Sequence, residues 1–431
     1  MWGEMKIRIS TRDLRVGMYV CELDRPWRDT PFLFQGFEVR SDEDVRKLQQ
    51  HCKEVVVLQE SAAISGSAGA KAWHDWKQAA SPAAKHTAEM QFEQELLKLN
   101  NHPTAHSIYE DKTTLEEEVQ MVKGAYTETR KAIHEFMRDV RLGRSLDGVV
   151  VRRLIGHLAD SVLRNPDALT CYAQLKRKDD YLAMHGLRCA ILALIFGRQL
   201  GLGREQLDNL GMAGLLHDIG MIKVPDEILS KPGRLSPIEL AIVRRHVTWG
   251  SELLEHSPGM PAAVTEAARN HHERYDGSGY LLGVAGDAIG DSGLIMAIVD
   301  YYDAVTSDRP YQTAISPYAA MRSMYAARGT LFQPQLIERF IQCLGIYPVG
   351  SVVELNTGEV GVVVALNRKA RLKPRVALVR QPDRSPYPVP PVVNLTQRRM
   401  NDGVPCDIER VLDPVDADID PVRYLPVTGT V

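Results

Sequence analysis

The spacing of apolar residues changes along the chain, and each spacing predicts a different kind of element. In the first 60 residues, short apolar and β-branched runs are separated by polar turns, which is typical of strands. We expect strands at residues 6–10, 18–21, 32–39 and 54–58. Ser41, followed by Glu43 and Asp44, resembles a helix start and predicts a helix at residues 42–51. Residues 1–60 are therefore expected to form a small α+β regulatory domain.

The next segment changes first to a linker composition and then to a helical one. Residues 61–72 consist almost entirely of Ser, Ala and Gly, which is typical of a flexible linker. Residues 88–99 and 112–141 are rich in Glu, Lys, Gln and Ala, with apolar residues at helical spacing. We expect residues 61–110 to form a flexible, partly helical linker. Residues 112–141 predict either a solvated helix or one through which the chain forms a homodimer, and the sequence does not choose between them.

A long stretch of helical periodicity occupies the middle of the chain. From residue 146 to residue 344 the sequence is rich in Ala, Leu, Met and Arg, and strand signals are nearly absent. Ser236, Pro237 and Glu239 supply an N-cap, a first-turn proline and a capping-box acid, so they predict the start of the helix that carries His246. Residues 111–345 are therefore expected to form one all-helical domain.

The pattern returns to strands after residue 347. Two β-branched runs, at residues 351–355 and 360–366, are joined by a short loop that contains glycine, and they predict a hairpin. Residues 375–379 would add a third strand, and the acidic, proline-containing residues 413–431 are expected to be loosely ordered. The predicted fold is thus mainly α: an all-helical domain with a small N-terminal α+β domain and a C-terminal β-hairpin extension over residues 346–431.

Composition excludes several classes of function. The chain has 52 Lys and Arg against 55 Asp and Glu, and this lack of a basic excess predicts no DNA partner. The longest apolar run, residues 189–196, is far shorter than the roughly 18 residues of a membrane-spanning helix. Charged residues within the first ten positions argue against a signal peptide. Six cysteines without a close pair favour reduced thiols and a cytoplasmic protein.

Histidine and aspartate residues recur in five stretches of the helical region, about one helix plus a turn apart. The candidate residues are His185, His217, Asp218, His246, His271, His272 and Asp300. Burying so many ionisable groups in apolar surroundings is costly unless each has a partner. A bound cation would partner all of them, and mixed imidazole and carboxylate ligands suit Fe, Mn, Zn or Ni better than Ca or Mg. We interpret His157 and His256 instead as hydrogen-bonded core residues.

The adjacent pair His217 and Asp218 favours two ions over one. Consecutive residues of a helix point about 100° apart, so these two side chains would splay around a two-metal cluster, with Asp218 as a bridge. Two ions about 3.5–4 Å apart suit phosphoester hydrolysis, in which a bridging hydroxide attacks phosphorus while the ions hold its oxygens. We therefore interpret His217 and Asp218 as the catalytic pair.

Residues 178–312 resemble the HD-GYP phosphodiesterases, a branch of the HD metal-hydrolase superfamily. The resemblance is carried by HDIGMIKVPDEILSKPG, HHERYDGSGY and VDYYDAVTSDRPYQ, in this order and at this spacing. The N-terminal RDLRVGMYV and the β extension also resemble what flanks this domain in one subgroup. The resemblance implies hydrolysis of cyclic di-GMP to linear pGpG, or onward to GMP, with two divalent metal ions (Fe, Mn or Ni).

Carried over position by position, the resemblance assigns all seven candidate residues to metal binding. It implies that Tyr280 contacts the substrate and that Arg309 lies near the phosphates, where a guanidinium can grip a phosphodiester through paired hydrogen bonds. Arg274 and Lys223 complete the predicted substrate-binding set. The partners that it implies are cyclic di-GMP and a diguanylate cyclase-type protein.

Four positions depart from the family pattern. Tyr181 stands where members with a third metal have glutamate, so a two-metal site is favoured. Met221 replaces the lysine of the family's HDIGK, and Lys223, two positions on, would point about 200° away on a helix. Leu281 replaces the proline of GYP, and Gln312 replaces a basic residue. These changes weaken the expected grip on substrate and its turnover.

Two other functions stay open beside the active phosphodiesterase. The missing basic residues favour a catalytically weak or degenerate receptor that binds cyclic di-GMP and signals through the N-terminal domain, although a complete ligand set argues against it. An HD hydrolase acting on mononucleotides is disfavoured by the adjacent His271 and His272 and by the GSGY segment.

Overall fold

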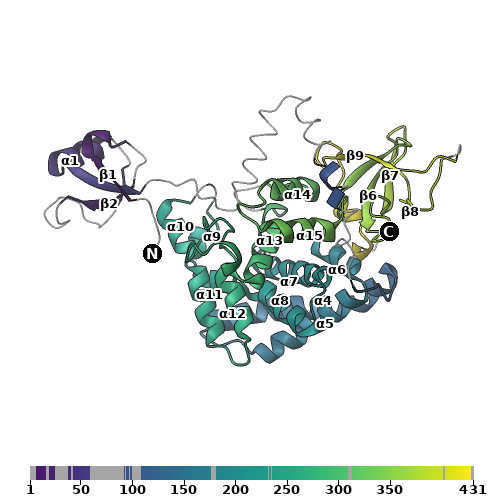
Figure 1. Ribbon diagram of the computed structural model, residues 1–431, viewed down its shortest axis with the longest axis horizontal. Helices are drawn as coiled ribbons and strands as arrows, with labels where there is room; N and C mark the ends of the chain where they lie inside the picture. The colour runs from purple at the N-terminus through teal and green to yellow at the C-terminus, as the bar shows by residue number, and fades with distance from the viewer. Residues whose placement is uncertain are drawn as a thin grey trace. The chain divides into compact units, whose positions relative to one another are not determined.

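The computed structural model places the chain in two compact units, residues 1–65 and 66–431. Both units are drawn in Figure 1 and are described separately. The described residues are 6–15, 19–24, 37–39, 42–58, 92, 94–96, 98–99, 108–175, 181–231, 233, 235–308, 313–400 and 403–428.

The N-terminal unit is an antiparallel sheet with one α-helix in its described part. Its strands are β1 (Lys6–Ser10), β2 (Tyr19–Leu23), β3 (Phe37–Glu38) and β4 (Glu54–Leu58), in the order β1-β4-β2-β3. Helix α1 (Asp42–His51) contributes Leu48 to a small core with Val20, Val39 and Val55. The predicted α+β character of this segment is confirmed.

Two helices form the centre of the second unit. Helices α7 (Tyr181–Leu200) and α13 (Asp291–Val305) are apolar around most of their circumference, and such helices are stable only when other elements surround them. Helix α7 contacts α4 (Leu115–Arg141), α8 (Arg204–Leu216) and α13, and all four lie together in Figure 1. The predicted all-helical body is confirmed.

The other helices surround this centre. They are α5 (Gly148–Arg164), α6 (Pro166–Ala173), α9 (Asp226–Leu229), α10 (Pro237–Arg244), α11 (His246–Glu255), α12 (Ala262–Asn270), α14 (Pro317–Ala326) and α15 (Pro334–Leu344). The predicted capping box is present: Ser236 Oγ accepts from Glu239 N–H, and the Glu239 carboxylate accepts from Ser236 N–H. The helix that it starts ends at Arg244, however, and His246 opens a new helix after a break at Arg245, which the sequence did not predict.

Two glycines let backbones approach closely at this centre. A Cβ on Gly214 of α8 would lie 2.6 Å from the backbone of Ala190 on α7, so glycine permits the close packing of these helices. A Cβ on Gly220, in the 3-10 turn η5 (Ile219–Lys223), would collide with the His246 carbonyl and the Gly250 nitrogen of α11. These contacts draw together the elements that carry the candidate residues.

The C-terminal segment is a larger sheet than the predicted hairpin. Strands β5 (Val352–Leu355) and β6 (Val360–Ala365) form that hairpin, and β7 (Arg375–Arg380) adds the expected third strand. Strands β8 (Val392–Asn394) and β9 (Ile408–Leu412) extend it to the order β8-β7-β6-β5-β9. The expectation of a loosely ordered tail is wrong for residues 413–428, because Leu425 is fully buried in the main core between the short turns η7 (Pro421–Tyr424) and η8 (Pro426–Thr428).

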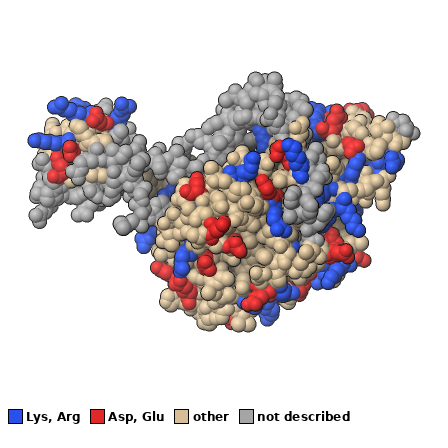
Figure 2. Space-filling view, in the orientation of Figure 1, with Lys and Arg blue, Asp and Glu red and all other residues tan. Residues whose placement is uncertain are grey.

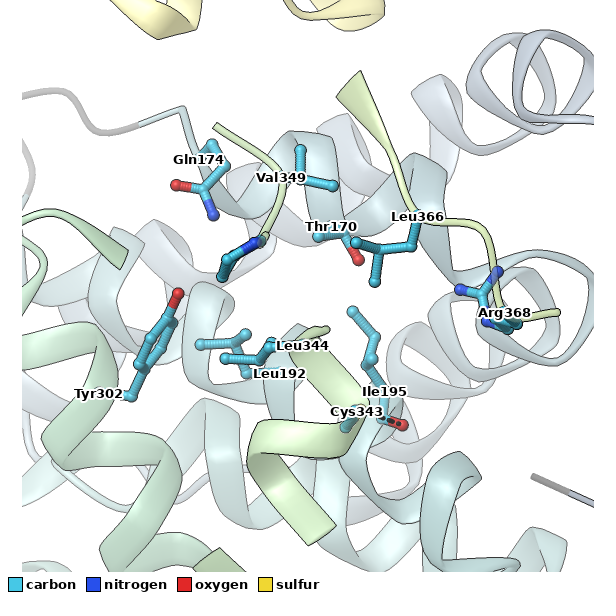
Figure 3. Close-up of a pocket in the computed structure, with 11 residues that line it drawn as sticks. Thr170, Gln174, Leu192, Ile195, Tyr302, Cys343, Leu344, Val349, Leu366 and Arg368 are labelled. Atoms are coloured by element: carbon cyan, nitrogen blue, oxygen red, sulfur yellow. Dashed lines mark hydrogen bonds between the residues drawn. The ribbon is translucent and has the colours of Figure 1, made fainter. Parts of the chain in front are cut away.

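Arginine ion pairs fasten this sheet to the helical body. Arg368 pairs with Asp167 of α6 at 2.6 Å and with Asp111 at 2.7 Å, and Arg375 pairs with Glu116 of α4 at 2.6 Å. A small cavity of about 10 Å³ lies beside Arg368, between residues of α6, α7 and α13 on one side and the chain around Val349 and Leu366 on the other (Figure 3). It has room for about one water molecule, and no candidate residue lines it.

The surface in Figure 2 shows basic and acidic side chains interspersed over the helical body, with no basic face among the described residues in this view. Among the described helices, none is long and apolar enough to cross a membrane.

Candidate metal centre

Five segments bring the seven candidate residues to one place, mostly at helix ends. His185 lies within α7 and Asp300 within α13. His217 closes α8, and Asp218 follows it at the junction with η5. His246 opens α11, and His271 closes α12 with His272 directly after it. The adjacent residues stay close to each other: His217 Nε2 lies 3.7 Å from Asp218 Oδ2, and the rings of His271 and His272 have centroids 4.0 Å apart.

The first group of side chains is His185, His217 and Asp300, together with one oxygen of Asp218. His185 Nε2 lies 3.1 Å from Asp300 Oδ1 and 3.6 Å from Asp218 Oδ2. His217 Nε2 lies 3.7 Å from Asp218 Oδ2 and 3.8 Å from Asp300 Oδ1. Two imidazole nitrogens and two carboxylate oxygens thus converge at a spacing that suits one cation.

The second group faces the other oxygen of Asp218. Asp218 Oδ1 lies 3.1 Å from His246 Nε2 and 3.5 Å from His271 Nε2, and these two nitrogens are 3.4 Å apart. His272 completes the group, with Nδ1 3.8 Å from Asp300 Oδ2. Asp218 therefore presents one carboxylate oxygen to each group, and Asp300 reaches both, which is the arrangement expected of carboxylates that bridge two ions.

Hydrogen bonds on the far side of each ring orient three of the histidines. The Nδ1–H groups of His217, His246 and His271 donate to the carbonyl oxygens of Gly214, Val243 and Ala268, at 2.9, 2.7 and 2.7 Å. This pairing leaves each Nε2 as a lone-pair donor turned toward the cluster. His217 Nε2 is buried and has no hydrogen-bond partner among the residues that the structure describes, and a bound cation would accept its lone pair. The residues therefore fit a divalent metal.

A fourth histidine is held by residues that sequence reasoning missed. His185 Nδ1 lies 2.7 Å from Asp303 Oδ2, and Arg188 donates to both Asp303 oxygens at 2.7 and 2.8 Å. Arg188 and Asp303 are each only 1% exposed. Their signal was present, because His185 and Arg188, like Asp300 and Asp303, are separated by three residues and so share one helix face.

The electrostatics of the centre favour a cation. Burial alone would raise the pKa of Asp218. His217 and His246 lower it by more than burial raises it, so the pKa lies well below the usual value. The pKa of Asp300 is also well below its usual value, because His185 and His217 outweigh burial. Burial, with the charge of neighbouring His271, holds the pKa of His272 well below that of free imidazole. Burial would lower the pKa of His246, but Asp218 outweighs it and raises that pKa. Ionised carboxylates and neutral imidazoles are the forms that bind metals, so at His246 a cation would compete with a proton.

Cys189 lies close to the first group but in a different orientation. Its Sγ is 3.7 Å from His185 Nδ1 and 3.9 Å from His185 Nε2. Because the sulfur is almost equidistant from the two nitrogens, it packs beside the imidazole ring. It therefore does not lie in the direction in which the Nε2 lone pair would bind a cation. Burial raises the pKa of the Cys189 thiol to about 12. We interpret Cys189 as a packing residue of α7.

The predicted substrate residues fall in different places. Tyr280 is half-buried and stacks on His272, with ring centroids 4.5 Å apart. Arg274 is buried, and its Nη1 donates to the carbonyl oxygens of His271 at 3.1 Å and Glu273 at 2.9 Å, so it supports the backbone beside the ligands. Lys223 is exposed at the end of η5. Arg309 lies outside the described residues.

The positions that depart from the family pattern are also spread out. Met221 is half-buried within η5, whose three residues per turn place Lys223 about 240° around the axis from it. The 3-10 turn therefore does not bring the lysine to the direction of Met221. Tyr181 is the first residue of α7, and Gln312 lies outside the described residues.

Glu273 organises the loop that contains Leu281. The buried Glu273 carboxylate accepts hydrogen bonds from the N–H groups of Leu282 at 2.6 Å and Val284 at 3.1 Å. Burial raises the pKa of Glu273, and backbone amides of this loop, Leu281 included, act in the opposite direction. A proline in place of Leu281 would have no N–H to contribute. Sequence reasoning had assigned Glu273 no role.

The two histidines assigned to the core are not buried. His157 and His256 are both exposed, and His256 Nδ1 lies 2.7 Å from the Glu252 carbonyl oxygen. They lie outside the cluster, as predicted, but on the surface.

Three known domain families match the chain. They are the HD domain at residues 169–336, a domain of unknown function (DUF3391) at residues 6–149, and the KOW domain associated with HD domain at residues 352–401. The HD match spans all seven candidate residues, and the KOW match falls on the C-terminal sheet. A helical HD-domain protein is thus the class that fold and site define.

One relative matches nearly the whole chain, and two others match less than half of it. Cyclic di-GMP phosphodiesterase PA4108 of Pseudomonas aeruginosa is 34% identical over 407 residues, which cover 92% of this chain and 91% of the relative. The cyclic di-GMP phosphodiesterase response regulator RpfG of Xanthomonas campestris is 36% identical over 193 residues, 44% of this chain and 51% of that protein. The 3′3′-cGAMP-specific phosphodiesterase 2 of Vibrio cholerae is 36% identical over 159 residues, 37% of this chain and 30% of that protein. This chain belongs to the HD-GYP phosphodiesterases.

Proposed function

We propose that this chain hydrolyses cyclic di-GMP at the His/Asp cluster, with two divalent metal ions. The observation that carries the proposal is Asp218, whose two carboxylate oxygens face two separate groups of imidazole nitrogens. The relatives named for cyclic di-GMP support the substrate class. Tyr181, at the position of a third-metal glutamate, favours two ions over three.

In this proposal the seven candidate residues are the metal ligands, and His217 and Asp218 are central to catalysis. Bound divalent cations would lower the pKa of a water molecule and hold the oxygens of a phosphodiester. The protein's part is to keep the ligands in place: backbone carbonyls orient His217, His246 and His271, while Asp303 orients His185. Such outer contacts raise ligand basicity and fix ring orientation.

Substrate contacts come from the neighbouring loops. Tyr280 stacks on His272 and would lie against the bound dinucleotide, while Arg274 keeps the segment of His271 and Glu273 in place. Arg309 and Lys223 stay predicted substrate contacts. Formation of a homodimer through α4 also stays a prediction. A cytoplasmic location and a diguanylate cyclase-type partner also stay predictions.

Hydrolysis assays test the proposal. The full chain is stripped of metal, reloaded separately with Fe(II), Mn(II) or Ni(II), and incubated with cyclic di-GMP or 3′3′-cGAMP, and products are separated by chromatography. We expect pGpG from cyclic di-GMP with at least one metal, and GMP where the linear product is cleaved before it leaves. Asp218→Ala should bind less metal and lose turnover, because it removes an oxygen from both groups. Absence of linear product with all three metals would contradict the proposal.

A receptor without efficient turnover is the second candidate, and Met221 favours it because no lysine stands at that position. A receptor would bind cyclic di-GMP in the metal-loaded state and release it intact. If a missing cation limits turnover, Met221→Lys should increase kcat/KM, and unchanged kinetics would count against that explanation.

A further inference from the structure

Arg244 and Tyr280 are held together beside the candidate metal ligands. Arg244 is the last residue of α10, and its guanidinium carbon lies 4.9 Å from the centre of the Tyr280 ring. The Tyr280 ring stacks on His272 at 4.5 Å and an interplanar angle of 25°. Each of the three side chains is partly exposed, so they form one stack that leads from a candidate ligand to Arg244.

Two hydrogen bonds, one between backbone groups and one from a side chain to the backbone, connect this stack to candidate ligands. Tyr280 N–H donates to the His272 carbonyl oxygen at 3.1 Å, which ties the tyrosine to the second ligand group. His246 Nδ1–H donates to the Val243 carbonyl oxygen at 2.7 Å, so the turn between α10 and α11 carries Arg244 and a candidate ligand together. These two hydrogen bonds therefore connect the chain segments of Tyr280 and Arg244 to candidate ligands.

The charges around the stack indicate what Arg244 binds. A cyclic dinucleotide carries two phosphodiesters, and in the proposed function the metal ligands would hold the one that is cleaved. Met221 offers no charge to the other, and Arg274 donates through Nη1 to backbone carbonyls. A guanidinium that rests on an aromatic face can present N–H donors at its edge to the paired oxygens of a phosphodiester. In Arg244 the Nη groups would make this contact, because its Nε is buried.

Resting on the proposed function, we propose that Arg244 is a substrate-binding residue that takes the uncleaved phosphodiester of the cyclic dinucleotide, with Tyr280 orienting its guanidinium. In this proposal Arg244, at the end of α10, supplies a positive charge that the family has at the position of Met221 and that this chain lacks there.

Steady-state kinetics of the Mn(II)-loaded full chain test this inference. Arg244→Ala should raise KM for cyclic di-GMP about 10- to 100-fold and change kcat less than about threefold, because it removes a charged hydrogen bond made equally in ground and transition states. Arg244→Lys should recover part of the loss. Arg245→Ala is the matched control, since Arg245 is exposed and lies at the same 4.9 Å over another ring, that of Trp249. Turnover of bis(p-nitrophenyl) phosphate, which has one phosphodiester, reports on the metal centre, and the Arg245→Ala control should turn it over at the wild-type rate.

Calorimetric binding separates this inference from the proposed function. Arg244→Ala should bind cyclic di-GMP and cyclic di-AMP about equally less tightly than the wild type does. Unchanged affinity in a wild type that cleaves cyclic di-GMP overturns the role of Arg244 alone. A loss confined to cyclic di-GMP assigns Arg244 to the guanine base and overturns the phosphate assignment. A wild type that cleaves bis(p-nitrophenyl) phosphate but neither binds nor cleaves cyclic di-GMP overturns the proposed function, and the Arg244 assignment with it.

Discussion

At the scale of single residues, the centre depends on groups that are not candidate ligands themselves but hold a candidate ligand in place. One carboxylate oxygen of Asp303 contacts His185, and both of its oxygens accept hydrogen bonds from the Arg188 guanidinium. A buried charge pair thus holds a histidine in place. The candidate ligands were predictable because histidine and aspartate are conspicuous in apolar helices. Each of Asp303 and Arg188 lies three positions from a candidate ligand on the same helix, and this spacing was the available signal. Their pairing with each other could not be predicted, because it forms only when α7 and α13 pack together.

We predict that Asp303→Asn weakens metal binding about 10- to 100-fold, since loss of an outer partner of a ligating histidine has effects of this size. The measurement is a competition titration of the metal-free chain with a chromophoric chelator. Asp291→Asn, on the exposed first turn of the same helix, is the control and should bind metal like the wild type. Equal affinities for the Asp303 variant and this control would show that His185 needs no such partner.

At the scale of elements, periodicity predicted the helices, the first hairpin and the α+β segment. It did not predict the break at Arg245, which lies where η5 closely approaches α11. It also did not predict strand β9, because this segment has only five residues, two of them charged, and pairs with β5 from more than 50 positions away. The tail was misjudged for the same reason, since the burial of Leu425 requires the helical core to be already in place.

Gly220 tests the approach of η5 to α11. Gly220→Ala should lower the free energy of unfolding by about 1–3 kcal/mol, the usual cost of overpacking, and should also weaken metal binding by moving Asp218 away from His246. Gly124→Ala is the control, because its Cβ would meet no atom within 4 Å on α4, and it should be neutral or stabilising by up to about 1 kcal/mol. Denaturant unfolding and metal titration measure both effects. A Gly220 variant as stable as the control would contradict the packing argument.

At the scale of the whole molecule, the C-terminal sheet is part of the second unit, fastened by ion pairs and by its own buried carboxylates. Burial alone would raise the pKa of Glu359, but hydrogen bonds from Tyr387, Thr357 and Arg398 outweigh it and leave the pKa below its usual value of 4.5. A carboxylate whose pKa is lower in the folded state than in the unfolded state stabilises the fold at any pH above the unfolded-state pKa. This contribution is lost as the pH falls through the folded-state pKa.

Glu359→Gln should therefore have a lower melting temperature than the wild type at pH 7, and the difference should shrink as pH falls below about 4.5. Thermal unfolding from pH 7 to pH 3 measures this convergence. Glu409→Gln on β9 is the control, because Glu409 is exposed, and it should follow the wild type throughout. A difference between Glu359→Gln and the wild type that stays constant with pH would show that the Glu359 charge contributes nothing.

The proposal of a two-ion centre at Asp218 is tested most directly by titrating the metal-free chain with Mn(II). Turnover of cyclic di-GMP and bound metal per chain are measured on the same samples. We predict that turnover is absent without metal and reaches its maximum at two equivalents, with pGpG as the first product. Full turnover at one equivalent, or in the metal-free chain, would contradict this account.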